Sequence, residues 1–70
     1  MNDPNAMTVY RFIETYMQAN GFAPSVRNIA DGCFMSRSNV IRYLDKLEAW
    51  GYITREPGQA RSIALLRTPE

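Results

Sequence analysis

Residues 36–46 contain the side chains with the clearest capacity for specific chemistry. Arg37 and Arg42 have planar guanidinium groups that can bind a phosphate, or bind O6 and N7 of guanine as a pair. The amide of Asn39 can pair with N6 and N7 of adenine, and Ile41 suits apolar contact with the methyl group of thymine. Together they indicate a nucleic-acid surface, whose candidate members are Ser36, Arg37, Ser38, Asn39, Ile41, Arg42 and Lys46.

Each of these residues also has a purely structural interpretation. Ser36 is first of all a helix cap, and Asn39 need not contact a base. Arg42 has a possible ion-pair partner in Asp45, three residues further along the chain. Ile41 could instead pack against the flank of the first helix. These alternatives remain open at the level of sequence.

A helix over residues 37–50 positions this surface. Val40, Leu44 and Leu47 fall on one side of it at 100° per residue, and the polar side chains fall opposite. The preceding helix begins after Ser25 and is expected to end at Gly32. Residues 33–35 leave only a short turn between the two helices, so they must cross steeply, as in a helix-turn-helix.

A longer helix precedes this pair. Asp3 can accept hydrogen bonds from the first free N–H groups, and Pro4 suits the first helical position. Gly21 ends the helix, because glycine tolerates a left-handed backbone. Its apolar stripe has the helical period and is assigned to the core: Val9, Phe12, Ile13, Tyr16 and Met17.

After residue 51 the hydrophobic period changes from helical to two. Residues 52–55 and 61–65 alternate as strands, with Pro57 and Gly58 in the turn between them. The expected fold is therefore mainly α (α+β): a three-helix winged helix-turn-helix with a C-terminal two-stranded antiparallel β-hairpin. It is one domain over residues 1–66, and residues 67–70 are a tail or the start of a linker.

Basic charge gathers in the second half of the chain. Residues 27–67 contain seven basic and four acidic side chains, a net charge of +3, whereas the whole chain has +1. This asymmetry is a mild indication of a polyanionic partner. Ser25 and Arg27 at the start of the second helix, and Arg61 on the hairpin, are further candidate DNA contacts, although Arg61 could also be an ordinary solvated charge.

Several functional classes are not expected. Cys33 is the only cysteine, histidine is absent, and no glycine-rich phosphate loop occurs, so no catalytic constellation, metal site or cofactor site can be drawn. No small-molecule ligand is evident. No apolar run approaches the roughly 20 residues that span a bilayer. A non-enzymatic, cytoplasmic protein without a membrane partner is expected.

Several segments resemble the N-terminal DNA-binding domain of the SOS-response repressor LexA. The resemblance runs from Asp3 to Leu66, with one apparent deletion near Cys33, and it rests on Ala23–Ala30 (APSVRNIA), Ser38–Leu47, Gly51–Ile53 and Gly58–Leu66. It implies a winged helix that contacts an operator half-site through the residues of the third helix, assisted by Arg61.

The chain departs from that family in two respects. Well-known members have two acidic residues where Ile41 and Arg42 stand, so the familiar operator is not expected. The resemblance does not extend to the family's serine-lysine self-cleaving domain, which usually also provides dimerisation, so autoproteolysis by this chain is not expected.

The expected function is sequence-specific binding of double-stranded DNA, as a transcriptional repressor or its DNA-binding fragment. Homodimerisation on a palindromic operator is a possible extension. The alternative is a winged-helix module for protein–protein interaction, which Ile41 and the modest net charge slightly favour.

Overall fold

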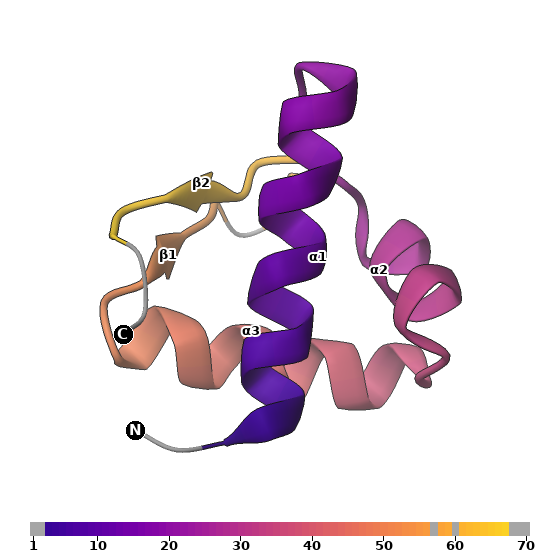
Figure 1. Cartoon of the computed structure of the whole chain (residues 1–70). Helices are drawn as coiled ribbons and strands as arrows, with labels where there is room; N and C mark the ends of the chain where they lie inside the picture. The colour runs from indigo at the N-terminus through magenta and orange to yellow at the C-terminus, as the bar shows by residue number, and fades with distance from the viewer. Residues whose placement is uncertain (1–2, 57, 60, 68–70) are drawn as a thin grey trace.

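The computed structural model describes residues 3–56, 58–59 and 61–67. Its elements are three helices followed by two short strands: α1 (Pro4–Asn20), α2 (Val26–Cys33), α3 (Arg37–Ala49), β1 (Ile53–Thr54) and β2 (Ala64–Leu65). In Figure 1, α1 crosses α3 steeply, with α2 at one end of α3 and the strands at the other. This confirms the mainly helical winged helix-turn-helix fold.

The start and end of α1 follow the expected local chemistry. The Asp3 carboxylate accepts hydrogen bonds from the N–H groups of Asn5 and Ala6, and Pro4 occupies the first turn. Gly21 ends the helix with φ of 79°, and its N–H donates to the Met17 carbonyl at 2.9 Å. Both caps of α1 therefore agree with the prediction from the sequence.

The end of α2 differs from the prediction, because the helix continues through Gly32 to Cys33. Phe34 ends it instead, with a left-handed φ of 57°. Gly32 has a packing role: a Cβ atom there would lie 2.1 Å from Cε2 of Phe12. The glycine lets α2 approach α1 closely.

The two strands are shorter than the alternating pattern suggested. They pair antiparallel, with Ile53 opposite Leu65 and Thr54 opposite Ala64. Arg61 has a left-handed φ of 57°, which a strand cannot accommodate. The Ser62 hydroxyl instead accepts from the Glu56 N–H at 3.0 Å, so a side chain replaces part of the expected ladder.

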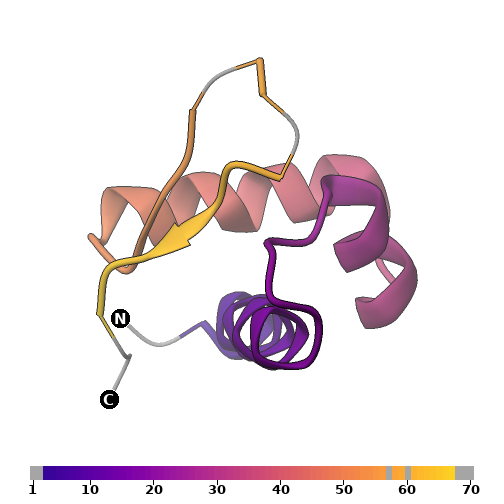
Figure 2. The same cartoon turned by 90° about the horizontal axis from the view of Figure 1, so that it is seen from above.

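The hairpin turn agrees with the prediction where it is described. The N–H of Gln59 donates to the Glu56 carbonyl at 3.2 Å, and Gly58 has φ of 76°. Pro57 lies outside the described residues. Figure 2 shows that the described parts of this connection project past α3 on the side away from α1.

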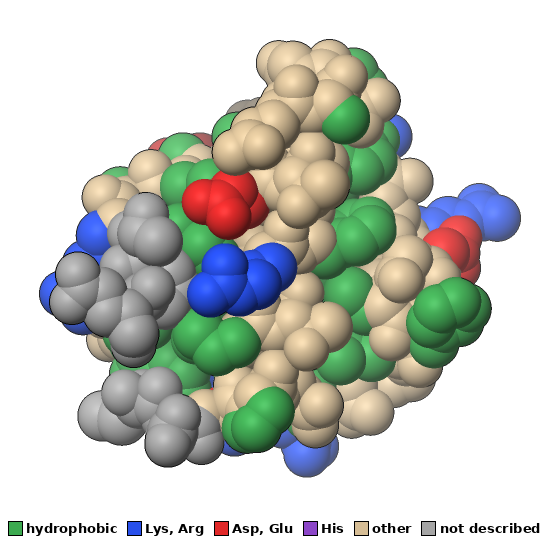
Figure 3. Space-filling model, viewed as in Figure 1, with side chains coloured by type: hydrophobic (Ala, Val, Ile, Leu, Met, Phe, Trp, Pro, Cys, Tyr) green, Lys and Arg blue, Asp and Glu red, His purple; other side chains and the backbone are tan. Residues whose placement is uncertain are grey.

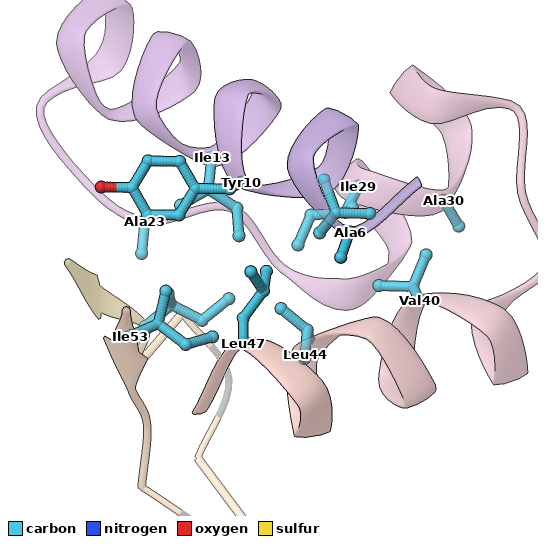
Figure 4. Close-up of a cluster of buried hydrophobic side chains, with 12 residues drawn as sticks. Ala6, Tyr10, Ile13, Ala23, Ile29, Ala30, Val40, Leu44, Leu47 and Ile53 are labelled. Atoms are coloured by element: carbon cyan, nitrogen blue, oxygen red, sulfur yellow. The ribbon is translucent and has the colours of Figure 1, made fainter. Parts of the chain in front are cut away.

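One hydrophobic core joins all five elements. Ile13 of α1, Ile29 of α2, Leu44 of α3 and Ile53 of β1 are almost completely buried and face a common interior (Figure 4). The expected stripe is only partly buried, since Val9 and Ile13 are in the core whereas the remaining members are half exposed; the half-exposed members are Phe12, Tyr16 and Met17.

The chain remains attached to the domain one residue beyond the boundary expected at Leu66. The Tyr10 hydroxyl donates to the Arg67 carbonyl at 2.8 Å, and Nη2 of Arg67 donates to the Trp50 carbonyl at 2.8 Å. The Arg67 guanidinium also lies 4.8 Å from the centre of the Tyr52 ring. Residues 68–70 of the expected tail lie outside the described part.

Candidate nucleic-acid interface

The outer side of α3 is open to solvent because its inner side supplies the core. Val40, Leu44 and Leu47 are fully buried, and the Ser36 hydroxyl caps the helix by accepting from the Asn39 N–H at 3.2 Å. All seven candidate residues on and before this helix are exposed: Ser36, Arg37, Ser38, Asn39, Ile41, Arg42 and Lys46. The predicted polar surface is therefore accessible to a partner and is not covered by other described parts of the protein.

Three of the candidate arginines keep their guanidinium groups available. Arg27, Arg37 and Arg42 are exposed, and none of them forms an ion pair within the described part of the chain. The pairing of Arg42 with Asp45, considered from the sequence, is wrong, because Asp45 is bound by Arg55. Arg37 and Arg42 therefore project from α3 as unpaired cations.

Lys46, in contrast, is bound to the start of α1. Its Nζ lies 2.9 Å from Oδ2 of Asp3 and 5.6 Å from the centre of the Tyr43 ring. The hydrogen bond from Lys46 holds the pKa of Asp3 below its ordinary value, and N–H donors from the first turn act in the same direction. The Lys46 charge is therefore partly compensated.

Arg61 is held by the segment between α1 and α2. Its Nη1 donates to the Ala23 carbonyl at 3.1 Å and to the Tyr16 hydroxyl at 3.3 Å. The guanidinium also lies 5.1 Å from the centre of the Phe22 ring. Although Arg61 is exposed, it fixes the hairpin to the segment that precedes α2. Ser25 in turn caps α2, its hydroxyl accepting from the Asn28 N–H.

Ile41 lies on the side of α3 that faces the hairpin, so the alternative that it packs on the flank of α1 is wrong. It lines a groove of about 390 Å³ between α3, the start of α2 and the hairpin. Val26, Leu44 and Ile63 provide apolar walls, and Arg61 lines the same groove. The structure therefore brings two predicted residues from distant parts of the chain, Ile41 and Arg61, to one surface.

Arg55, a basic residue of the hairpin, pairs with two carboxylates of α3 that the sequence did not identify as its partners. Its Nε donates to Oε1 of Glu48 at 3.1 Å, and its Nη2 is hydrogen-bonded to Asp45. The sequence contains only a weak signal for this cluster. Its two carboxylates are three residues apart on one helix, but Arg55 reaches them only because the chain turns back along α3 into β1.

The opposite face offers a different surface. Figure 3 shows the side on which α1 lies in front, where hydrophobic and uncharged polar groups predominate and basic side chains appear as a central patch and at the edges. The described residues form no continuous cationic surface on this side. The unpaired arginines of α3 make the outer side of that helix the better site for a polyanion.

Other functional classes find little support among the described residues. Within residues 3–56, 58–59 and 61–67, no group of three or more carboxylate or thiol side chains lies close enough together to hold a metal ion. Partial burial raises the pKa of the Cys33 thiol, which disfavours the reactive thiolate. No helix in the described ranges has both the length and the apolar character needed to cross a membrane.

Comparisons with known proteins agree with this geometry. The family model of the LexA DNA binding domain matches residues 5–62. LexA repressors from Thermosipho africanus and Moorella thermoacetica are 42% and 39% identical to the chain, over 89% and 90% of its length. The LexA repressor of Staphylococcus carnosus is 34% identical over 83% of the chain.

The chain spans about a third of the length of these curated relatives, between 28% and 31%. The matched region includes α2, α3, β1 and all of α1 except its first residue. It also contains each candidate DNA-contacting residue, from Ser25 to Arg61. The chain belongs to the LexA DNA-binding domain family.

Proposed function

We propose that this domain binds double-stranded DNA sequence-specifically, as the DNA-binding part of a transcriptional repressor in the SOS response. The observation that best supports the proposal is the exposed outer side of α3, with Arg37 and Arg42 unpaired. An α-helix fits the major groove of B-DNA, which is about 12 Å wide. α3 is accordingly the element that enters the groove.

The contacts divide into those that position the domain and those that distinguish bases. Ser36 and Ser38 lie at the N-terminus of α3, where free N–H groups and the helix dipole favour a phosphate. Ser25 and Arg27 take the same role at the start of α2. Such phosphate contacts supply affinity and register but no sequence information.

Base discrimination falls to the middle of α3. Arg42 and Arg37 suit guanine, and Asn39 suits adenine. Ile41 is 46% exposed at the rim of the groove, where it can meet a thymine methyl group. The preferred operator should differ from that of members with acidic residues at the positions of Ile41 and Arg42.

The hairpin and Lys46 contribute from the edges. Arg61 has to share its guanidinium between the Ala23 carbonyl and an adjacent phosphate or minor groove. Lys46 contacts a phosphate only if the pairing with Asp3 is loosened or shared. Both side chains are therefore expected to contribute less than Arg42.

Selection of duplexes from a randomised pool tests this function directly. We expect enrichment of one half-site, and Arg42→Ala should weaken binding to it by about 1–3 kcal/mol, with a preference altered at one base position. Arg11→Ala is the matched control, because Arg11 is an exposed arginine of α1 and not of α3. No enrichment over non-specific DNA would refute base recognition, and an equal loss on all sequences would make Arg42 a phosphate contact.

A second candidate function is protein binding through the groove at the hairpin. The observation that favours it is the apolar wall formed by Val26, Ile41 and Ile63. If the domain binds DNA, the logarithm of its association constant should fall by ~0.9 for each phosphate contact when the salt concentration rises tenfold. Association through apolar contact persists at high salt, so salt titration separates the two.

A further inference from the structure

Two carboxylates lie on the same helix as the unpaired arginines. Asp45 and Glu48 are three residues apart on α3, so their side chains lie on one side of it. Both remain accessible, with side chains 64% and 41% exposed. A carboxylate at such a position repels the phosphate backbone of a duplex that approaches α3.

Arg55 binds both carboxylates. It follows β1 directly, and its Nε lies 3.1 Å from Oε1 of Glu48 while its Nη2 is bonded to Asp45. Its side chain is only 22% exposed, less than either of its partners. The guanidinium is thus placed between α3 and the hairpin, with its charge directed at the two acidic groups.

The charges on this part of the molecule nearly cancel. Arg42, Asp45, Glu48 and Arg55 sum to zero, whereas the same set without the charge of Arg55 has a net charge of −1. The Arg55 guanidinium is hydrogen-bonded to both Asp45 and Glu48, well within the screening length of about 8–10 Å at physiological salt. Loss of the Arg55 charge would therefore act on a duplex bound to α3 without any direct contact.

We propose that Arg55 is a positioning residue that sets the affinity of α3 for DNA by neutralising Asp45 and Glu48. The proposal rests on the proposed DNA-binding function and adds a residue outside the direct contacts. Three roles for Arg55 must be distinguished: neutralisation of the carboxylates, direct contact with a phosphate, and attachment of the hairpin to α3.

Four proteins separate these roles when their affinities for one duplex are measured over a range of salt concentrations. Arg55→Gln should weaken binding several-fold to roughly tenfold, because two carboxylates are left uncompensated. Asp45→Asn with Glu48→Gln should strengthen binding several-fold, and the released Arg55 should steepen the salt dependence by up to ~0.9. The triple variant, with all three changes, should bind at least as tightly as the wild type.

The order of the variants' affinities for the duplex decides between the three roles of Arg55. If the triple variant is as weak as Arg55→Gln while the carboxylate double variant is not weakened, Arg55 contacts DNA itself and the proposal is overturned. If the carboxylate double variant binds more weakly than the wild type, the ion pairs serve to hold the hairpin, which also overturns it. Arg11→Gln is the matched control for net charge and should reduce affinity less than Arg55→Gln.

Two further measurements keep the result interpretable. Thermal unfolding of each variant, followed by circular dichroism, identifies any loss of affinity caused by loss of fold. Arg55→Lys should retain most of the affinity, since it keeps the positive charge without the guanidinium fork. If the wild type binds no duplex, both the proposed function and this inference are refuted. If the wild type binds but the affinities of the variants do not follow the expected order, only the inference is refuted.

Discussion

At the scale of single residues, Phe34 is one of two non-glycine residues with a left-handed backbone in the described part of the chain. It ends α2 with φ of 57°, a region that favours glycine, and its side chain is 95% exposed. The aromatic ring therefore gains almost no burial in return for the strain. Its backbone N–H still donates to the Ala30 carbonyl, as the end of a helix requires.

Phe34→Gly should stabilise the domain. Glycine removes a strain of about 1–2 kcal/mol but costs about 0.5–1 kcal/mol in unfolded-state entropy, so a net gain of roughly 0.5–1 kcal/mol is expected. That gain corresponds to a rise in melting temperature of a few degrees, which circular dichroism would detect. Phe34→Ala is the control and should give no gain, because alanine keeps the strained φ. A lower melting temperature for Phe34→Gly would show that the ring stabilises the turn.

At the scale of elements, the fit of α2 against α1 depends on the missing side chain of Gly32. A Cβ atom would lie 2.1 Å from Cε2 and 2.5 Å from Cζ of Phe12, both well inside van der Waals contact. The ring of Phe12 is half-buried against the core, so it cannot move away without losing contact. This close approach sets the position of α2 at the end of α3.

Gly32→Ala should accordingly destabilise the domain by about 1–3 kcal/mol, the usual cost of overpacking. The same substitution in a Phe12→Ala background removes the clash and should become stabilising by up to about 1 kcal/mol, because alanine favours a helix over glycine. Chemical denaturation of the four proteins measures this coupling. An equal effect of Gly32→Ala in both backgrounds would contradict the steric explanation.

The ion pair between Asp3 and Lys46 joins the start of α1 to α3 and gives stability a pH dependence. The pKa of Asp3 is lowered in the folded protein, so the deprotonated form is the one that folding favours. The stabilisation is therefore fully present above the unfolded pKa of about 3.9 and is lost as the pH falls through the lower folded value.

Asp3→Asn keeps a side-chain oxygen for capping but removes the charge. The wild type should have the higher melting temperature at about pH 6, and the difference should shrink as the pH is lowered to about 3. Lys46→Gln, which removes the partner, should reduce the same difference at the higher pH. A constant difference between wild type and Asp3→Asn across this range would show that the ion pair contributes nothing.

At the scale of the whole molecule, charge and size limit how tightly one copy can bind DNA. The net charge of the chain is only +1. Two candidate DNA contacts, Lys46 and Arg61, and the nearby Arg55 already bind acceptor groups within the domain. Few phosphate contacts remain for a monomer, so a single half-site should be bound weakly.

Two copies joined by a flexible linker should bind a palindromic pair of half-sites 10²–10⁴-fold more tightly than a single copy. The half-sites should lie one helical turn, about 34–36 Å, or a multiple of it apart. Competition binding on operators with different spacings would measure the gain. A gain that does not depend on the spacing would show that the two copies do not occupy the half-sites together.

Features that depend on local chemistry could be predicted before any tertiary contact was known. Helix caps are formed by neighbouring residues, so Asp3, Ser36 and Gly21 could be assigned without tertiary contacts. The helical spacing of apolar residues is likewise a local pattern, and it separates the inner from the outer side of α3. This separation predicted the exposed site. The element order then identified the winged helix-turn-helix.

Features that arise between distant segments could be assigned only from the folded chain. Gly32 was interpreted as a helix end because its neighbour Phe12 is twenty residues away, and the pairing of Arg55 with α3 requires the turn into β1. Arg61 was expected on a strand but takes a left-handed φ and binds the Ala23 carbonyl. Which cations are free for DNA depends on which carboxylates and carbonyls the folded chain brings beside them, and no local pattern encodes that.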